Sequence, residues 1–404
     1  MARILIAWEF GRNLGHIARD LPLARACRDA GHEVVWAVRD LRGAARELAG
    51  EGFALLQAPL LRSGQVNAPP INFADMLLRE GYEDTAGLLG VLQGWHALMR
   101  LTSVSAVVHD YAPTALLAAR ALGLPTMILG SGFMVPAPAV PSPGFFPDVA
   151  PAALQAAEDR FVANVNVALQ ALGATSVASL RDLYAQGEQV LTTFEELDPF
   201  GPRGQARYVG PMYALGRQTR VEWHGGGANR IFAYLRPEVP SCENLLEALQ
   251  AGQAEVVCAM PGLPAAWPAR FPRVRFVPGA VDMDVLLPAA DLAITNGSGT
   301  IPNCLLAGVP VLVLPHFNEQ YLAGLRLQRY GAGLVVPGKA STAEYVGLVD
   351  RLLSQSTFKQ QARAFAQRYA WHHRDTTGRA VFESLERMLQ RAAGVGASSS
   401  GTVR

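Results

Sequence analysis

The chain has 404 residues, a formal net charge of +1, and hydrophobic residues at 50% of its positions. This length exceeds one ordinary core and predicts two domains of about 200 residues each. The balanced charge gives no strong overall field toward a nucleic acid, so we expect no nucleic-acid partner.

The cysteines and the apolar runs bear on the compartment. The four cysteines lie far apart, without the spacings of zinc ligands, which favours free thiols in a reducing compartment over disulfides or a metal site. The N-terminus reads as a strand rather than a secretion signal, and no run reaches about 18 uninterrupted apolar residues. We expect no transmembrane segment and a cytoplasmic protein, either free or peripheral at a membrane, that is a monomer or a homodimer.

The first half alternates short β-rich runs with amphipathic helical patterns. Helices are expected over 17–30, 73–103 and 114–122, and the first and last of these are followed by glycine, a common helix stop. The expected strands are 3–8, 33–38, 53–59, 106–110, 125–130 and 189–194. Apolar strands that alternate with helices predict an α/β fold with a parallel sheet covered on both faces.

A proline-rich apolar segment, 133–151, interrupts this alternation. So many prolines exclude a regular element, and long loops in compact domains are often functional. A surface loop and a binding lid are both open interpretations, and the aromatic pair Phe145-Phe146 favours the lid.

The pattern restarts after a Gly- and Pro-rich stretch, 197–216, with strands expected at 231–235, 255–260, 274–279, 292–295, 311–315 and 333–337. This predicts a second doubly wound domain, and the two sheets are expected to face one cleft with the carboxyl ends of their strands. The expected organisation is an N-terminal domain over 1–205, a linker over 206–216, a second domain over 217–370, a C-terminal helix over 371–392 and a disordered tail over 393–404.

The strongest local signal is "DLAITNGSGTIPNCLLAGVPVLVLP" (291–315). A buried strand ends here, a loop of small residues follows and a helix begins. The free backbone N–H groups of the helix start can bind an anion such as a diphosphate, and the glycines let the backbone approach it closely. The residues expected at this site are Thr295, Asn296, Gly297, Ser298, Gly299 and Thr300. The alternative is a plain strand-to-helix turn with a Ser or Thr cap.

Two further features lie near this loop in the pattern. Glu319-Gln320 follows the next strand, and a carboxylate beside an amide can fix adjacent sugar hydroxyls; alternatively, Glu319 only favours the helix dipole. Arg236, just after the first strand of the second domain, is suited to a phosphate.

These pieces together resemble the donor-binding half of GT-B glycosyltransferases. The run from Asp284 to Asp291, the glycine-rich loop, "LLAGVPVLVLP", the Glu-Gln pair and "GAG" are similar to family 1, the UDP-glycosyltransferase and macrolide-glycosyltransferase-like group. The resemblance implies a GT-B fold of two Rossmann-like domains whose last helix packs back on the first domain. It also implies an inverting, metal-independent transfer from a UDP-sugar or dTDP-sugar to a hydroxyl of a small or lipophilic acceptor, with no further cofactor.

The resemblance extends to the first strand-to-helix turn. In the family a His in this turn deprotonates the acceptor, and an Asp at the end of a later strand stabilises it; His16 and Asp110 occupy these places. An imidazole with an ordinary pKa of about 6.5 can take a hydroxyl proton near neutral pH. Each residue could instead cap a helix. The residues expected to line an acceptor pocket are Glu9, Arg12, Phe133 and Phe145.

The chain departs from the family pattern in the segment that binds the nucleotide-sugar donor. A diphosphate-binding His is missing at Thr295 or Asn296, an acidic ribose contact is missing near Asn303, and no Trp stacks on the base, which leaves the backbone of Ala280 and Val281 for the nucleoside. Two alternatives therefore stay open: a nucleotide-sugar hydrolase, because "LGHIARDLPLA" also resembles the GxGHxxR turn of such enzymes, and a catalytically idle accessory protein that binds a partner enzyme or a nucleotide sugar.

Overall fold

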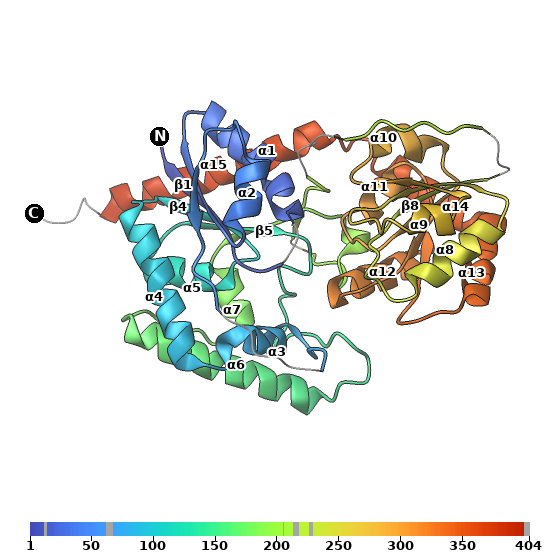
Figure 1. Cartoon of the computed structure of the whole chain (residues 1–404). Coiled ribbons are helices and arrows are strands. Elements are labelled where there is room, and N and C mark those ends of the chain that lie inside the picture. The colour runs from blue at the N-terminus through green and yellow to red at the C-terminus, as the bar shows by residue number, and fades with distance from the viewer. Residues whose placement is uncertain (12–13, 62–67, 205, 213–217, 226–228, 400–404) are drawn as a thin grey trace, which may run out of the picture. The chain divides into compact units, whose positions relative to one another are not determined.

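The computed structural model describes residues 1–11, 14–61, 68–204, 206–212, 218–225 and 229–399. The chain divides into two compact units (Figure 1). The first unit comprises 1–193, 203–214 and 373–404, and the second comprises 194–202 and 215–372. The second unit therefore includes 194–202, a segment that the sequence analysis placed in the N-terminal domain.

In the described part of the first unit, seven strands form a parallel sheet in the order β3-β2-β1-β4-β5-β6-β7. The strands are β1 (Arg3–Trp8), β2 (Glu33–Val38), β3 (Ala54–Gln57), β4 (Ala106–Asp110), β5 (Thr126–Gly130), β6 (Glu188–Leu191) and β7 (Arg207–Tyr208). The predicted parallel sheet is confirmed. β7 lies inside the segment 206–216 that was expected to be a linker, and it extends the sheet at one edge.

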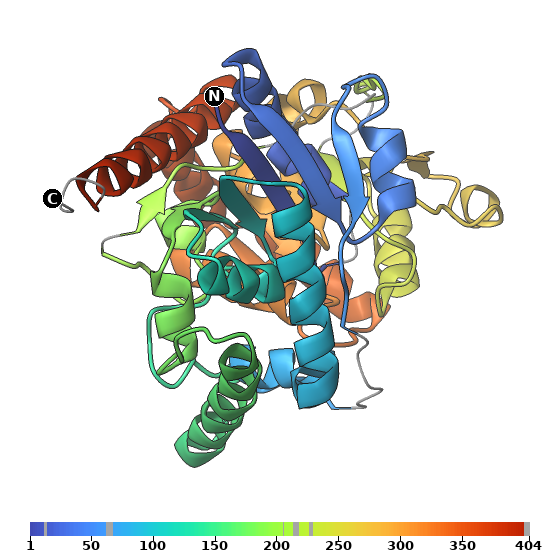
Figure 2. The same ribbon diagram turned by 90° about the vertical axis from the view of Figure 1, so that its left-hand side faces the viewer.

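Helices cover this sheet. They are α1 (Gly15–Asp29), α2 (Leu41–Glu47), α3 (Phe73–Leu77), η1 (Leu78–Tyr82), α4 (Thr85–Leu101), α5 (Pro113–Ala121), α6 (Pro151–Ala171), α7 (Leu180–Ala185) and α15 (Arg374–Ser399). The helical region expected over 73–103 breaks at Gly81, whose φ of 115° no helix accommodates. In Figure 2, α6 projects away from the sheet.

The C-terminal helix α15 belongs to the first unit and runs along α1 (Figure 1). The two helices approach closely at Gly378, where a Cβ would lie 2.9 Å from Pro22. A polar contact between His32 Nε2, just after α1, and Glu386 Oε1 of α15 (2.8 Å) adds to this contact. α15 continues to Ser399, beyond residue 392, where the tail was expected to begin.

The proline-rich segment is held in place by a buried carboxylate of α6. Glu158 is 2% exposed, and its Oε2 accepts hydrogen bonds from the backbone N–H (3.1 Å) and hydroxyl (3.0 Å) of Ser142. Its Oε1 accepts from the N–H of Leu180 at the start of α7 (2.7 Å). One side chain thus ties the segment to two helices.

The aromatic residues of this segment are part of the core. Phe145 is 2% exposed, packs on Phe133 at a ring distance of 5.4 Å, and donates its N–H to the carbonyl of Ile71 (2.8 Å). From the other side, buried Arg203 donates to the carbonyls of Gly132 (2.6 Å) and Pro136 (3.1 Å). The structure therefore shows an anchored segment here rather than the expected lid.

In the described part of the second unit, six strands form a parallel sheet in the order β10-β9-β8-β11-β12-β13. The strands are β8 (Arg230–Tyr234), β9 (Glu255–Ala259), β10 (Val274–Val277), β11 (Leu292–Thr295), β12 (Val311–Val313) and β13 (Gly333–Val335). The predicted second parallel-sheet domain is confirmed.

The helices of the second unit are η2 (Glu195–Leu197), α8 (Cys242–Ala251), α9 (Trp267–Arg270), α10 (Met283–Leu286), η3 (Leu287–Ala289), α11 (Ile301–Leu306), α12 (Asn318–Tyr330), α13 (Thr342–Ser354) and α14 (Ser356–Arg368). α13 begins with a capping box between Ser341 and Glu344. Just before η2, Phe194 packs on Tyr369 at a ring distance of 4.1 Å. This contact anchors the segment 194–202 in the second unit.

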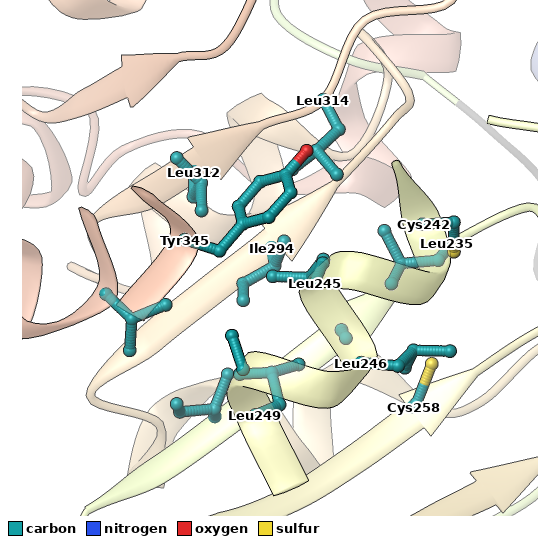
Figure 3. Close-up of a cluster of buried hydrophobic side chains, with 14 of the residues drawn as sticks. Leu235, Cys242, Leu245, Leu246, Leu249, Cys258, Ile294, Leu312, Leu314 and Tyr345 are labelled. Carbon is teal, nitrogen blue, oxygen red and sulfur yellow. The ribbon is translucent and has the colours of Figure 1, made fainter. Parts of the chain in front are cut away.

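One of the hydrophobic clusters of this unit lies between α8, α13 and the sheet (Figure 3). Leu245 and Leu249, one helical turn apart on α8, face Ile294 of β11, and Tyr345 of α13 closes the cluster. Each fully buried leucine contributes about 1.5–3 kcal/mol. All four cysteines are free and buried, and burial raises the pKa of Cys242 to about 12.

Candidate active site

In each sheet the strand order reverses at one pair of neighbouring strands, and the predicted site residues lie at these two places. In the first unit β1 and β4 pair in register, with Trp8 opposite Asp110. In the second unit β8 and β11 pair, with Tyr234 opposite Thr295. Ligands of open parallel sheets bind outside the carboxyl ends of the strands at such a reversal. The side chains at these two sheet edges are therefore the candidates for the functional site.

At the edge of the first sheet, His16 and Asp110 form a buried pair. His16 lies in the first turn of α1 and is 6% exposed, and Asp110 ends β4 and is fully buried. The distance between His16 Nδ1 and Asp110 Oδ2 is 2.7 Å. Because a carboxylate only accepts hydrogen bonds, Nδ1 carries the proton and Nε2 keeps its lone pair. This is the tautomer that a general base requires.

Aromatic rings hold the plane of the imidazole. Trp8 stacks on His16 with a centroid distance of 5.1 Å and an interplanar angle of 17°. Tyr111 lies nearly parallel to the imidazole ring at 6.4 Å. The Trp8 indole is itself fixed by donating Nε1–H to the carbonyl of Phe10 (2.6 Å). The position of the imidazole is thus determined by both packing and hydrogen bonding.

Gly11 lies beside the free ring nitrogen of His16. Its φ is 84°, in the left-handed region that favours glycine. A Cβ at this position would overlap His16 Nε2 and lie 3.1 Å from Cε1. Glycine is therefore required here both for the backbone conformation and to leave room at Nε2.

Two residues of α1 that sequence reasoning did not assign join this pair. Arg19 donates from Nη2 to Asp110 Oδ1, and the same nitrogen lies 3.1 Å from His16 Nδ1. Burial raises the pKa of Asp110, but Arg19 and His16 outweigh it and hold this pKa below its usual range. Burial and the charge of Asp110 raise the pKa of Asp20 well above its usual range, which favours the protonated form of this carboxyl. The i, i+3 spacing of His16 and Arg19 on one helix is the signal that could have found Arg19.

The expected acceptor-pocket residues do not form one exposed surface. Glu9 is fully buried, and its Oε2 accepts from the N–H of Thr114 at the start of α5 (2.9 Å). Burial raises the pKa of Glu9 to about 8. Phe133 and Phe145 are buried against each other. These three residues are therefore buried in the first unit, and their place in an acceptor pocket stays a prediction. Arg12 lies outside the described residues.

At the edge of the second sheet, Thr295 and Asn296 are scaffold residues. Thr295 is fully buried, and its Oγ1 accepts from the N–H of Gly297 (3.1 Å). Asn296 accepts from the N–H of Arg236 (2.7 Å) and donates to the carbonyl of Leu314 (2.9 Å), so its amide joins the ends of three strands. Both side chains thus hold the loop in place, and the contact of these residues with a diphosphate stays a prediction.

The outer part of the same loop is open. Gly299 is exposed, and a Cβ on it would point into open space. Ser298 donates its hydroxyl to Glu319 Oε1 (2.9 Å), which links the predicted diphosphate loop to the predicted sugar contact. Thr300 is the N-cap of α11 and is 7% exposed. Arg236 is exposed at the end of β8.

The predicted sugar contact Gln320 and the predicted nucleoside contacts Ala280 and Val281 already take part in interactions within the protein. The side-chain oxygen of Gln320 accepts from the backbone N–H groups of His316 (2.7 Å) and Phe317 (3.3 Å) and so caps α12. The carbonyl of Ala280 accepts from the N–H of Thr219 (3.0 Å), and Val281 is 3% exposed. The backbone groups expected to meet the nucleoside are therefore partly occupied.

Within the described residues, no three His, Cys, Asp or Glu side chains are grouped so that they could hold a metal ion. A search of the same residues for a membrane-crossing helix, one both long and apolar enough, finds none.

Comparison with known proteins points to glycosyltransferases. Residues 243–376 match the family model "Erythromycin biosynthesis protein CIII-like, C-terminal domain". A sterol 3-beta-glucosyltransferase of Vanderwaltozyma polyspora is 28% identical over 118 residues, which are 29% of this chain and 10% of that protein. A PGL/p-HBAD biosynthesis glycosyltransferase of Mycobacterium tuberculosis is 28% identical over 172 residues, 40% of this chain and 39% of that protein. The matched regions thus span well under half of these relatives.

Solved structures match over nearly the whole chain. The glycotransferase of kitacinnamycin has a TM-score of 0.70 at 19% identity and covers 96% of this chain and 98% of its own. The spinosyn rhamnosyltransferase SpnG with thymidine diphosphate has a TM-score of 0.67 at 19% identity, covering 94% and 99%. The glycosyltransferase VinC with dTDP has a TM-score of 0.67 at 18% identity, covering 96% and 100%. The expected GT-B fold is confirmed, and the family match confirms the predicted likeness of the second unit to macrolide-type glycosyltransferases.

Proposed function

We propose that the protein is an inverting, metal-independent glycosyltransferase. It moves a sugar from a UDP-sugar or dTDP-sugar to a hydroxyl of a small or lipophilic acceptor. The observation that carries this proposal is the His16–Asp110 pair, which joins a buried imidazole and a buried carboxylate at 2.7 Å at the reversal point of the first sheet. The thymidine diphosphate named with two of the matched structures favours a dTDP-sugar as the donor.

The proposed reaction uses His16 as the base. Nε2 takes the proton of the acceptor hydroxyl while that oxygen attacks the anomeric carbon. The bond between this carbon and the diphosphate breaks on the opposite face, the electron pair leaves with the diphosphate, and the configuration inverts. Asp110 receives the Nδ1–H bond and stabilises the imidazolium. A positioned base of this kind accelerates a reaction roughly 10²–10⁴-fold.

In the second unit, the loop after β11 is the proposed diphosphate contact. The hydroxyl of Thr300, the backbone at Gly299, and Arg236 supply hydrogen-bond donors for the leaving charge, while the hydroxyl proton of Ser298 is donated to Glu319. Glu319 is the proposed sugar contact, and its hydrogen bond to Ser298 orients its carboxylate. In this proposal Asn296 and Gln320 shape the loops rather than touch the donor.

The test compares donors, acceptors and one catalytic substitution. Purified protein is mixed with UDP-, dTDP- and GDP-sugars, with and without a sterol or another lipophilic alcohol, and thermal shift and nucleotide release are measured. We expect a shift with one donor, acceptor-dependent release, and a loss of roughly 10²–10⁴ in release rate for His16→Gln with the shift intact. His96→Gln, a half-buried histidine on α4, is the matched control and should keep full activity.

The remaining outcomes separate the alternatives. Release that needs His16 but proceeds equally without any acceptor indicates a nucleotide-sugar hydrolase. If none of the donors shifts the melting temperature, the protein lacks a working donor site. This result contradicts the proposal and supports an accessory role.

A further inference from the structure

The residue of the first site that the proposed reaction leaves unused is Arg19. It lies one turn after His16 on α1, and its side chain is 13% exposed. Besides its contact with His16, its guanidinium reaches three other side chains: Nη2 donates to Asp110 Oδ1, Nε lies 3.4 Å from Asp20 Oδ1, and Nη1 lies 3.2 Å from the sulfur of Met134. A planar guanidinium can hold such a set of partners in one geometry.

The two oxygens of Asp110 therefore serve different partners. Oδ2 orients the imidazole, and Oδ1 pairs with Arg19. In an isolated His–Asp pair, the carboxylate charge favours the protonated ring. Here a cation already balances that charge, and it also lies 3.1 Å from the ring nitrogen. A proton on His16 would thus add a second positive charge to a buried cluster, which is unfavourable in a medium of low dielectric constant.

The third titratable group of this cluster is Asp20, on α1. Burial and the charge of Asp110 raise the pKa of Asp20 well above its usual range, which favours its protonated, neutral form. Trp8 of β1 and Tyr111 after β4 cover the faces of the imidazole, and neither is charged near pH 7. Gly11 lies at Nε2. Arg19 and Asp110 are thus the charged groups that face His16 among the residues that the structure describes.

We propose that Arg19 is a positioning residue that keeps His16 available as a base. By pairing with Asp110, it lets the carboxylate orient the imidazole without drawing a proton onto the ring in the resting protein. This inference rests on the proposed function for its role in catalysis. The charge arrangement itself can be tested without any substrate.

The first measurement is the titration of the His16 ring by NMR, with selectively labelled histidine and with His16→Gln to identify its signal. In Arg19→Met we expect the ring to protonate at a pH at least about one unit higher than in the wild type, as for an imidazole beside an unpaired carboxylate. Arg19→Lys keeps the positive charge and should stay within about half a unit of the wild type. If Arg19→Met does not fold, Arg19→Gln removes the same charge and is measured instead.

Two control variants separate the charge of Arg19 from a general effect. Asp20→Asn keeps the Arg19–Asp110 pair and mimics the protonated carboxyl that the raised pKa of Asp20 favours, so it should leave the midpoint unchanged. Arg25→Met removes another arginine of α1, one that pairs with Glu51 (3.2 Å) away from the imidazole, and should also leave it unchanged. An unchanged midpoint in Arg19→Met, or an equal change in Asp20→Asn, overturns the inference.

The second measurement is the pH dependence of turnover. In Arg19→Met, the acidic limb of the rate profile should move up with the titration, so that turnover falls at pH 7, by at most about tenfold for each unit of that change, and recovers at alkaline pH. A loss that is equal at every pH indicates a merely structural role and contradicts the inference. If the wild type consumes no donor, the proposed function fails, while the titration still decides how Arg19 and Asp110 share their charge.

Discussion

Replacing Gly11 by alanine tests whether His16 Nε2 is the working atom of the site. The added methyl group would overlap Nε2, so either the loop or the imidazole must move. The imidazole cannot move without cost, because it is bonded to Asp110 at 2.7 Å and stacked on Trp8. Any displacement of the imidazole takes the base away from its position, and any displacement of the loop leaves the methyl group in front of it.

The size of the effect follows from these contacts. An alanine at a φ of 84° costs about 1 kcal/mol of stability. Loss of the charge-assisted hydrogen bond to Asp110 adds about 1.5–3 kcal/mol. We therefore expect Gly11→Ala to lower the free energy of unfolding by about 2.5–4 kcal/mol in all. Turnover should fall by roughly 10²–10⁴, as for the loss of a general base.

Gly31 provides a matched control. Its φ of 85° is nearly the same, but a Cβ there would meet no atom within 4 Å. Gly31→Ala should therefore cost only the backbone strain, about 1 kcal/mol, and keep full turnover. Urea unfolding and turnover at saturating donor are measured for both variants. If Gly11→Ala retains more than a tenth of the wild-type turnover, or if Gly31→Ala loses as much, the assignment of Nε2 is refuted.

Two further predictions concern buried carboxyl groups of the first unit. Glu158→Ala leaves the N–H groups of Ser142 and Leu180 buried without their acceptor, so the free energy of unfolding measured in urea should fall by at least about 3 kcal/mol. Asp159→Ala, at the exposed neighbouring position, is the control and should lower this free energy by less than about 0.5 kcal/mol. Equal losses in the two variants would contradict the anchoring role of Glu158. The pKa of Glu9 rises from 4.5 in the unfolded chain to about 8 on folding, so its contribution to stability is full below pH 4.5 and is lost as the pH rises to about 8. In thermal unfolding across this pH window, Glu9→Gln should remove that part of the decline; a variant whose melting temperature follows the wild-type curve would show that Glu9 does not cause it.

Much of the fold could be predicted because the strands are short, apolar and separated by clear helix signals. "RILIAW" and "EVVWAV" became β1 and β2 with the expected bounds. β7 could not be predicted in this way, since two residues, Arg207–Tyr208, carry no periodicity. The break at Gly81 was missed because a single glycine inside an apolar pattern is compatible with a helix.

The site could be predicted only in part, because sequence spacing does not show which side chains are turned inward. His16 and Asp110 were predicted as a pair and lie within hydrogen-bond distance. Glu9 follows the same strand as His16, yet it faces the start of α5. Asn296 is polar and sits in the expected loop, but its amide joins neighbouring strand ends. These hydrogen bonds join segments that are distant in the sequence, so sequence spacing does not predict them.

The way the chain divides between its two units has a consequence for engineering. Residues 194–202 precede the strand β7 of the first unit but belong to the second, where Phe194 packs on Tyr369 and the Tyr369 hydroxyl donates to Glu196 (2.6 Å). The helix α15 follows the second unit but packs on α1. A chimaera made by joining two homologues at one crossover near residue 216 would therefore mix parental residues inside both cores. A transplant that respects the packing must exchange 194–202 together with 215–372 and keep α15 with its original first unit.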